Sequence, residues 1–316
     1  MKEQLIDWFK SWLGSSGDLP ASTPRGALQA AQASHPKLIA TGHRLDLGEE
    51  LFTDLQPKIP TVLHGLFDSG RAVIGEVAIR SPAAFANALP SGRYWVEVYS
   101  GLGPFFEAAA HAFYSSMILI NKDGTVTEPQ IDFDQSDNEL VKILRAYPAN
   151  GEVLDSKLSF SARQTELARK LARAAQVFVV AHELGHLIKW EADKSTELTT
   201  EGEIAADKLG LAMSLGMLKQ EDVPLSGDDI TDAYAGAEFA LRLFSALNAI
   251  GFDFKADSLH PYPKDRLEAL RSQARDIFGT MFDFIFVSRR AFSHDLILQR
   301  MEASVAGRKA ETGIPI

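Results

Sequence analysis

The sequence predicts an α+β fold, in which a mixed N-terminal part with a small sheet precedes a mainly helical C-terminal part. Residues 71–80 and 94–99 alternate apolar and polar side chains closely enough to predict strands. After about residue 160, apolar residues instead recur at the spacing of helices. A chain of 316 residues is long enough to bury a large core, in one large domain or two ordinary ones.

The chain divides into three expected parts. Residues 1–36 begin with an amphipathic segment at 2–13, expected to be a short helix docked on the protein body, and continue as a linker rich in Gly, Ser, Ala and Pro. Residues 37–160 are the mixed α/β part, and residues 161–306 are the helical part. We expect the second and third parts to form one continuous unit.

The mixed part contains several expected elements. A helix is expected at 104–115, and a hairpin is expected where Met117–Asn121 is followed by the turn-forming pair Asp123-Gly124. We expect either 94–99 or 117–121 to be an exposed edge strand. The acidic stretch at 131–139 (IDFDQSDNE) predicts a solvated strand or turn.

The helical part is predicted to contain five helices. They are expected at 162–191, 198–219, 228–249, 263–279 and 283–304.

Composition excludes several classes of function. The net charge of −10 argues against nonspecific binding to nucleic acid, which needs clustered positive charge. The absence of cysteine excludes disulfides, thiol catalysis and thiolate metal ligands. No apolar stretch reaches about 18 residues, and the N-terminus lacks the pattern of a secretory signal, so no integral membrane segment is expected. We therefore expect a cytoplasmic location.

One short motif within the helix predicted at 162–191 carries chemistry. It reads His182-Glu183-Leu184-Gly185-His186, the H-E-x-x-H pattern. Histidines four residues apart project from one face of a helix and can bind the same metal ion, here expected to be Zn²⁺. Glu183 is turned about 100° from His182 around the helix axis, so it suits a general base beside the metal. We expect Gly185 to reduce side-chain bulk near the metal.

A catalytic zinc ion needs a third protein ligand and an open position for water. Glu203 is the expected ligand, because Asp207 follows it one helical turn later and the apolar residues 204–206 give that helix a buried side. Glu197 and Glu201 are the alternative ligands. Asp207 is expected behind the ligands, where it would accept a hydrogen bond from a histidine and fix its tautomer.

HELGH followed by a helix with the pattern E-x-x-x-D resembles the gluzincin class of zinc metallopeptidases. Residues 203–210 (EIAADKLG) and 260–267 (HPYPKDRL) are similar to segments of the HtpX and CAAX-prenyl-protease group, in the same chain order. That group usually has transmembrane helices and a longer gap between its zinc-binding segments, and this chain departs from both. The chain also resembles the Lit phage-exclusion peptidases and, in its short gap, the ImmA/IrrE-type proteases. The resemblance implies a zincin-like active-site helix.

Three residues further along the chain are expected to assist. His260 or Tyr262 would hydrogen-bond the oxyanion that forms during hydrolysis. Arg266 would orient Asp207 or bind a substrate carboxylate through two hydrogen bonds. The alternatives are a structural role for His260 and Tyr262 in the loop that enters the helix at 263–279, and a surface position for Arg266.

These residues together predict a zinc-dependent endopeptidase that hydrolyses a peptide bond in an intracellular protein, with metal-activated water and Glu183 as general base. The substrate peptide is expected to dock on an edge strand of the mixed part. Two alternatives remain: a metal-stabilised regulatory or binding module without turnover, and a zinc hydrolase that acts on a non-peptide amide or ester.

Overall fold

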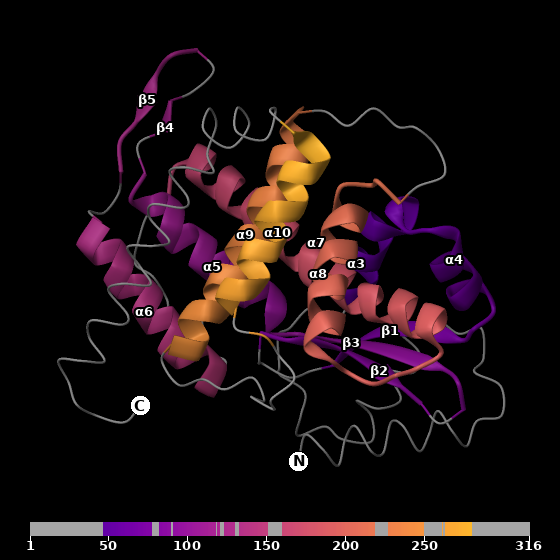
Figure 1. Cartoon of the computed structure of the whole chain (residues 1–316). Helices are drawn as coiled ribbons and strands as arrows, with labels where there is room; N and C mark the ends of the chain where they lie inside the picture. The colour runs from indigo at the N-terminus through magenta and orange to yellow at the C-terminus, as the bar shows by residue number, and fades with distance from the viewer. Residues whose placement is uncertain are drawn as a thin grey trace.

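The fold of the described residues is α+β, as predicted, with helices surrounding one long central helix and a small sheet at one end (Figure 1). The computed structural model describes residues 47–77, 82–89, 91–117, 119–120, 123–129, 133–150, 160–218, 227–249, 261 and 263–279. The segments predicted at 1–36 and 283–304 lie outside these residues.

The sheet has three strands, β1 (Ala72–Val77), β2 (Ala84–Ala88) and β3 (Tyr94–Tyr99), in the order β1-β3-β2. β1 is parallel to β3, and β2 is antiparallel to it. The prediction that 94–99 forms an edge was therefore wrong: β3 is the central strand, pairs on both sides and is buried along its whole length. β2, whose sequence AFANA has weak strand character, occupies an edge among the described strands instead.

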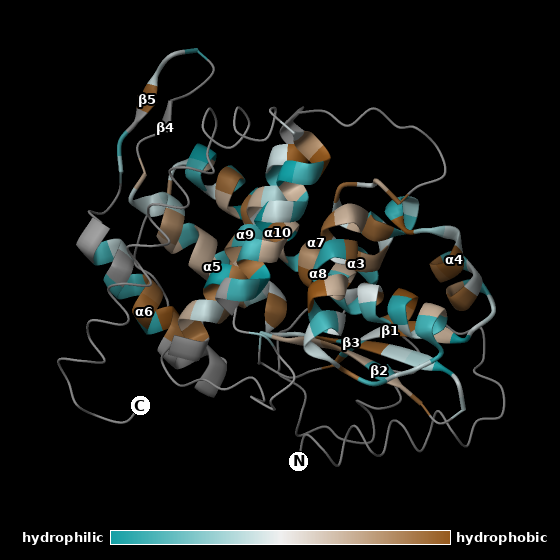
Figure 2. Cartoon of the chain, viewed as in Figure 1, coloured by the Kyte–Doolittle hydropathy of each residue, from teal (hydrophilic) through white to brown (hydrophobic). Residues whose placement is uncertain are grey.

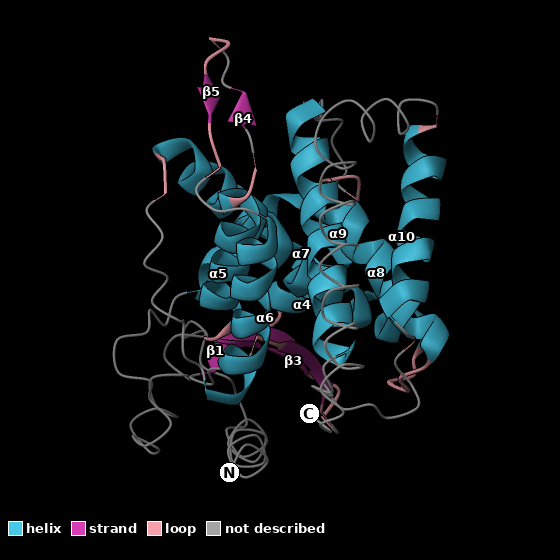
Figure 3. Ribbon diagram, turned by 90° about the vertical axis from the view of Figure 1, so that its left-hand side faces the viewer, coloured by secondary structure: helices cyan, strands magenta, loops and turns pink. Residues whose placement is uncertain are grey.

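The predicted hairpin is confirmed. It consists of β4 (Leu119–Ile120) and β5 (Val126–Thr127), paired in antiparallel fashion. Gly124 adopts a φ of +81°, and the Asp123 carboxylate accepts a hydrogen bond from the backbone N–H of Thr125 at 3.0 Å, which closes the turn. The hairpin forms a separate two-stranded sheet and stands away from the three-stranded sheet in Figures 1 and 3.

Five helical elements accompany the strands in the mixed part. They are α3 (Leu47–Leu55), the 3₁₀ turn η2 (Gln56–Lys58), α4 (Thr61–Asp68), α5 (Leu102–Ser115) and α6 (Phe133–Asn150). The prediction of a solvated strand or turn at 131–139 was wrong, because α6 begins within it. Its acidic residues precede an apolar stripe, Leu140, Val141 and Leu144, that is buried. Ser136 also donates a hydrogen bond from its hydroxyl to the carbonyl oxygen of Ala112 on α5.

Four helices of the helical part lie within the described residues. They are α7 (Ala162–Asp193), α8 (Thr200–Ser214), α9 (Gly227–Ala249) and α10 (Pro263–Phe278), close to the predicted ranges. α7 begins with a capping box, in which the Ser161 hydroxyl accepts from the N–H of Gln164 and the Gln164 side chain accepts from the N–H of Ser161. α10 is amphipathic: hydrophilic residues lie along its visible side in Figure 2, while Leu267, Leu270 and Ala274 are buried.

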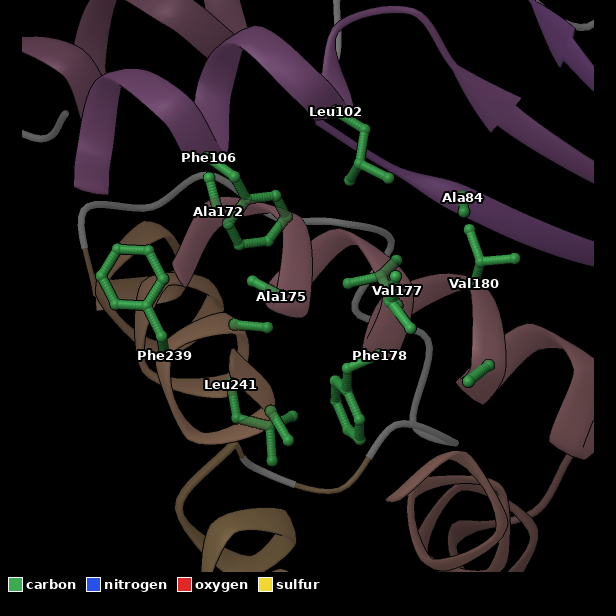
Figure 4. Close-up of a cluster of buried hydrophobic side chains, with 14 of the residues drawn as sticks. Ala84, Leu102, Phe106, Ala172, Ala175, Val177, Phe178, Val180, Phe239 and Leu241 are labelled. Carbon is green, nitrogen blue, oxygen red and sulfur yellow. The ribbon is translucent and has the colours of Figure 1, made fainter. Parts of the chain in front are cut away.

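Helix α7 lies at the centre of the hydrophobic core. Helices α5, α8 and α9 pack around it, and β2 and β3 also contact it. Figure 4 shows Phe106 of α5 and Phe239 of α9 gathered around Ala172 and Ala175 of α7. Burial on nearly all sides fixes α7 in place, and the H-E-x-x-H motif lies in its buried C-terminal half.

Candidate metal centre

Three buried side chains converge at the predicted metal site. The Nε2 atoms of His182 and His186 lie 3.2 Å apart, and each lies 3.4 Å from one carboxylate oxygen of Glu203. One ligand atom from each residue lies within 4.8 Å of the others. The three residues are only 7%, 4% and 2% exposed, respectively. This group could hold a metal ion, as the sequence predicted.

The loop between α7 and α8 returns Glu203 to the histidines. Helix α7 ends at Asp193 and is capped by Lys194, which adopts the left-handed conformation with φ of 52° and so reverses the chain. Helix α8 begins at Thr200 and is capped by Thr199, whose hydroxyl accepts a hydrogen bond from the N–H of Gly202 at 2.9 Å. Glu203 therefore lies in the first turn of α8 and faces α7.

Two glycines allow α7 and α8 to approach closely. A Cβ atom on Gly185 would lie 2.8 Å from the carbonyl oxygen of Ala206, and one on Gly210 would lie 2.9 Å from the backbone nitrogen of His182. Both contacts are with backbone, which cannot move aside without shifting a helix. The expectation for Gly185 is thus refined: its missing side chain makes room for the backbone of α8, which carries Glu203.

We expect Gly185→Ala to lower the free energy of unfolding by about 1–3 kcal/mol, as overpacking typically does, and to weaken metal binding. This loss should occur although alanine is the better helix former. Gly65→Ala in α4 is the matched control, because a Cβ there meets nothing within 4 Å. Urea unfolding of both variants measures the effect, and equal stability of the two would contradict the close-approach explanation.

A second layer of charged groups holds His182. Its Nδ1 lies 2.9 Å from Oδ1 of Asp207, and because a carboxylate can only accept, Nδ1–H is the donor. Arg266 donates to both oxygens of Asp207, each at 2.7 Å, from Nε and Nη2. Asp207 is fully buried. Burial acts to raise the pKa of Asp207, but the Arg266 charge outweighs it and lowers that pKa, so the carboxylate stays ionised.

The two imidazoles differ in their electrostatics. Burial lowers the pKa of His182, but the charge and hydrogen bond of Asp207, with help from Glu203, raise it to about 10. Burial and the neighbouring His182 charge lower the pKa of His186 to about 3. Burial acts to raise the pKa of Glu203, yet the hydrogen bond and charge of His182 lower it to about 2. The carboxylates of Asp207 and Glu203 therefore stabilise positive charge at the point where the three ligand atoms meet.

The donor set fits a divalent cation. Two imidazole nitrogens and one carboxylate are the ligands of a common type of catalytic zinc site. The hydrogen bond from Nδ1–H to Asp207 directs Nε2 of His182 at the other two ligands, and a bound metal ion would displace the Nε2 proton that His182 carries at neutral pH. With neutral imidazoles, Glu203 and Asp207 carry two negative charges against the single positive charge of Arg266, so the cluster favours a cation.

Glu183 lies beside the ligand group and contacts the sheet. Its Oε2 accepts a hydrogen bond of 2.6 Å from the backbone N–H of Ala86 on β2. Burial, opposed by the His182 charge, raises the pKa of Glu183 to about 7. A carboxyl with a pKa near neutrality can both accept and release a proton at physiological pH, which is the property that a general base needs.

The structure distinguishes the sequence alternatives. Glu197 and Glu201 are exposed and lie outside the ligand group, whereas Glu203 lies within it. Arg266 is bound to Asp207, which is the first of the two roles expected for it. His260 and Tyr262 lie outside the described residues.

Sequence analysis missed two contributors to the site. The Ala86 N–H is a backbone group, and no sequence signal identifies it. Trp190 stacks on His186 with ring centroids 5.7 Å apart and planes at 25°. Its position four residues after His186, on the same helical face, is a signal that could have indicated it.

Comparison of the chain with models of protein families, with curated proteins and with solved structures found no match. Among the described residues, no helix has the length and hydropathy needed to cross a membrane.

Proposed function

We propose that this protein is a zinc-dependent endopeptidase that hydrolyses a peptide bond in an intracellular protein. The observation that carries the proposal is the convergence of His182, His186 and Glu203, with Glu183 adjacent and held by the sheet. Zn²⁺ bound by the first three residues would act as a Lewis acid and lower the pKa of a water from about 15.7 toward about 7.

In this proposal Glu183 moves the proton. Its carboxylate takes a proton from the attacking water and delivers it to the amine that leaves. The hydrogen bond from Ala86 fixes one carboxylate oxygen, so the other is available for this transfer. Its pKa of about 7 lets the group act in both directions near neutral pH. His260 and Tyr262 remain the donors that the sequence offers to the oxyanion.

Asp207 and Arg266 keep His182 in one tautomer and one orientation. Arg266 holds both oxygens of Asp207, and Asp207 in turn accepts from His182 Nδ1–H. This chain of bonds keeps the Nε2 lone pair available for the metal and makes the imidazole a stronger ligand.

Strand β2 is the edge on which we propose that a substrate peptide docks. At the two ends of β2, Ala83 O accepts a hydrogen bond from Tyr99 N, and Leu89 N donates one to Arg93 O. In an antiparallel pair, alternate residues direct their N–H and C=O groups toward the neighbouring strand. The backbone groups of Ala84, Ala86 and Ala88, which lie between these positions, therefore point away from β3. The Ala86 N–H reaches Glu183, so this open side of β2 borders the proposed general base. A peptide added here as a strand would pass the reacting groups.

The test is incubation of the zinc-loaded protein with a library of proteome-derived peptides, followed by sequencing of the new termini. We expect cleavage that a chelator abolishes and that added Zn²⁺ restores. N-methylation of single amides in a cleaved peptide should lower kcat/KM at alternate positions, because alternate amides face β2. A library that stays intact with one zinc bound per chain would contradict the peptidase proposal, and uniform effects of N-methylation would contradict strand docking.

A further inference from the structure

The two histidines of the metal centre are held in different ways. Nδ1 of His182 is fixed by the Asp207 and Arg266 pair. For Nδ1 of His186, no hydrogen-bond partner is found among the residues that the structure describes, and its contacts to His182 and Glu203 both involve Nε2. A ligand imidazole normally has its second nitrogen fixed by a hydrogen bond, so the other contacts of the His186 ring with described residues bear on how it is oriented.

The ring of Trp190 lies against His186 and is itself held between two rings. It stacks on His186 at a centroid separation of 5.7 Å and on Tyr94 at 5.9 Å, with interplanar angles of 25° and 29°. Trp190 is only 4% exposed. The result is a series of three rings, from His186 through Trp190 on α7 to Tyr94 at the beginning of β3.

A group of polar contacts anchors the far end of this series. The Tyr94 hydroxyl donates to Oε1 of Glu191 at 2.6 Å, and Arg71 donates to both oxygens of the same carboxylate, at 2.6 and 3.3 Å. The Arg71 guanidinium also lies over the Tyr94 ring, 5.9 Å from its centroid. These contacts tie the C-terminal turn of α7 to the sheet and prevent Tyr94 from moving away from Trp190.

We propose that Trp190 is a positioning residue, which fixes the orientation of the His186 imidazole for metal binding by aromatic stacking. The inference rests on the metal site of the proposed function. A stacked aromatic pair corresponds to a factor of about two to ten in an equilibrium constant, and that is the change in Zn²⁺ affinity expected when the ring is lost.

The test measures Zn²⁺ affinity, by competition with a chromophoric chelator, and the visible absorption of the Co²⁺ form. We expect Trp190→Leu to weaken Zn²⁺ binding about two- to tenfold and to change the Co²⁺ spectrum. Trp190→Phe, which retains a ring, should return the affinity to within about twofold of wild type. A purely structural role predicts no such rescue and no change in the spectrum. If the Leu variant does not fold, Trp190→Met provides the same comparison.

Phe113→Leu is the matched control, because it also removes a buried ring from an aromatic contact, here an edge-to-face one with Phe239. Phe113 lies far from the metal site. The backbone oxygen of its neighbour Tyr114 accepts a hydrogen bond from the Gln164 side chain, and Gln164 lies 22 residues before His186 on α7, or about 33 Å along the helix. The control should lower Tm and leave Zn²⁺ affinity unchanged. Wild-type affinity in Trp190→Leu, or an equal loss in Phe113→Leu, would overturn this inference alone, whereas a wild-type protein that binds no Zn²⁺ would overturn the proposed function as well.

Discussion

Glu183→Gln should reduce kcat by about 10²- to 10⁴-fold while one zinc ion stays bound per chain. The amide cannot take a proton from water, so turnover is lost. Its side-chain oxygen can still accept the hydrogen bond from Ala86, and therefore β2 should keep its place beside α7. Steady-state kinetics on a cleaved peptide, together with zinc analysis of the same sample, measure both effects.

The matched control for this variant is Glu201→Gln. Glu201 is an exposed glutamate two residues before Glu203 on α8, and the same change of charge there should leave kcat and zinc content unaltered. Unchanged turnover in Glu183→Gln would exclude its role as general base. Zinc binding without turnover in the wild type would instead support a regulatory or binding module.

Arg266→Leu is expected to lower the free energy of unfolding by about 3–5 kcal/mol, because it leaves the fully buried Asp207 carboxylate without its counter-ion. Zn²⁺ affinity should fall about 10- to 100-fold, because Asp207 then no longer holds His182 in one orientation. Urea unfolding gives the first quantity, and competition with a chelator gives the second.

A double variant separates charge from orientation. In Asp207→Asn with Arg266→Leu both charges of this ion pair are removed, and the Asn carbonyl can still accept from His182 Nδ1–H. Most of the stability should therefore return, while zinc affinity recovers only in part. If Arg266→Leu alone were as stable as wild type, the buried ion pair would not have the structural role that its bonds suggest.

Much of the fold could be predicted from the sequence, because helix and turn formation depend on the spacing and conformational preferences of neighbouring residues. The helical part follows apolar spacing, and the hairpin follows from the pair Asp123-Gly124, whose glycine adopts a positive φ. Two predictions were wrong at places where tertiary packing determines the structure. The alternation at 94–99 predicts a strand but not its neighbours, and β3 proved to be central, with β1 and β2 paired on its two sides. The acidic stretch at 131–139 enters a helix whose apolar side becomes evident only beyond it.

The parts of the candidate site that depend on the spacing of side chains along a helix could be predicted from the sequence. His182 and His186 share a helical face. Glu203 could be chosen among the nearby glutamates because Asp207, which binds His182, follows it one helical turn later. The Arg266 contact with Asp207 was one of two roles that the sequence left open. The Ala86 hydrogen bond to Glu183 could not be predicted, because it depends on where a backbone N–H falls when β2 packs beside α7.

The most direct test of the account is the metal content of the purified protein. Elemental analysis should find one zinc ion per wild-type chain, and close to none in His186→Ala and in Glu203→Ala. Glu197→Ala, which changes an exposed glutamate in the loop before α8, should keep the full content. A wild-type protein without bound divalent metal after incubation with Zn²⁺, or a Glu203→Ala variant that binds it as tightly as wild type, would contradict the account.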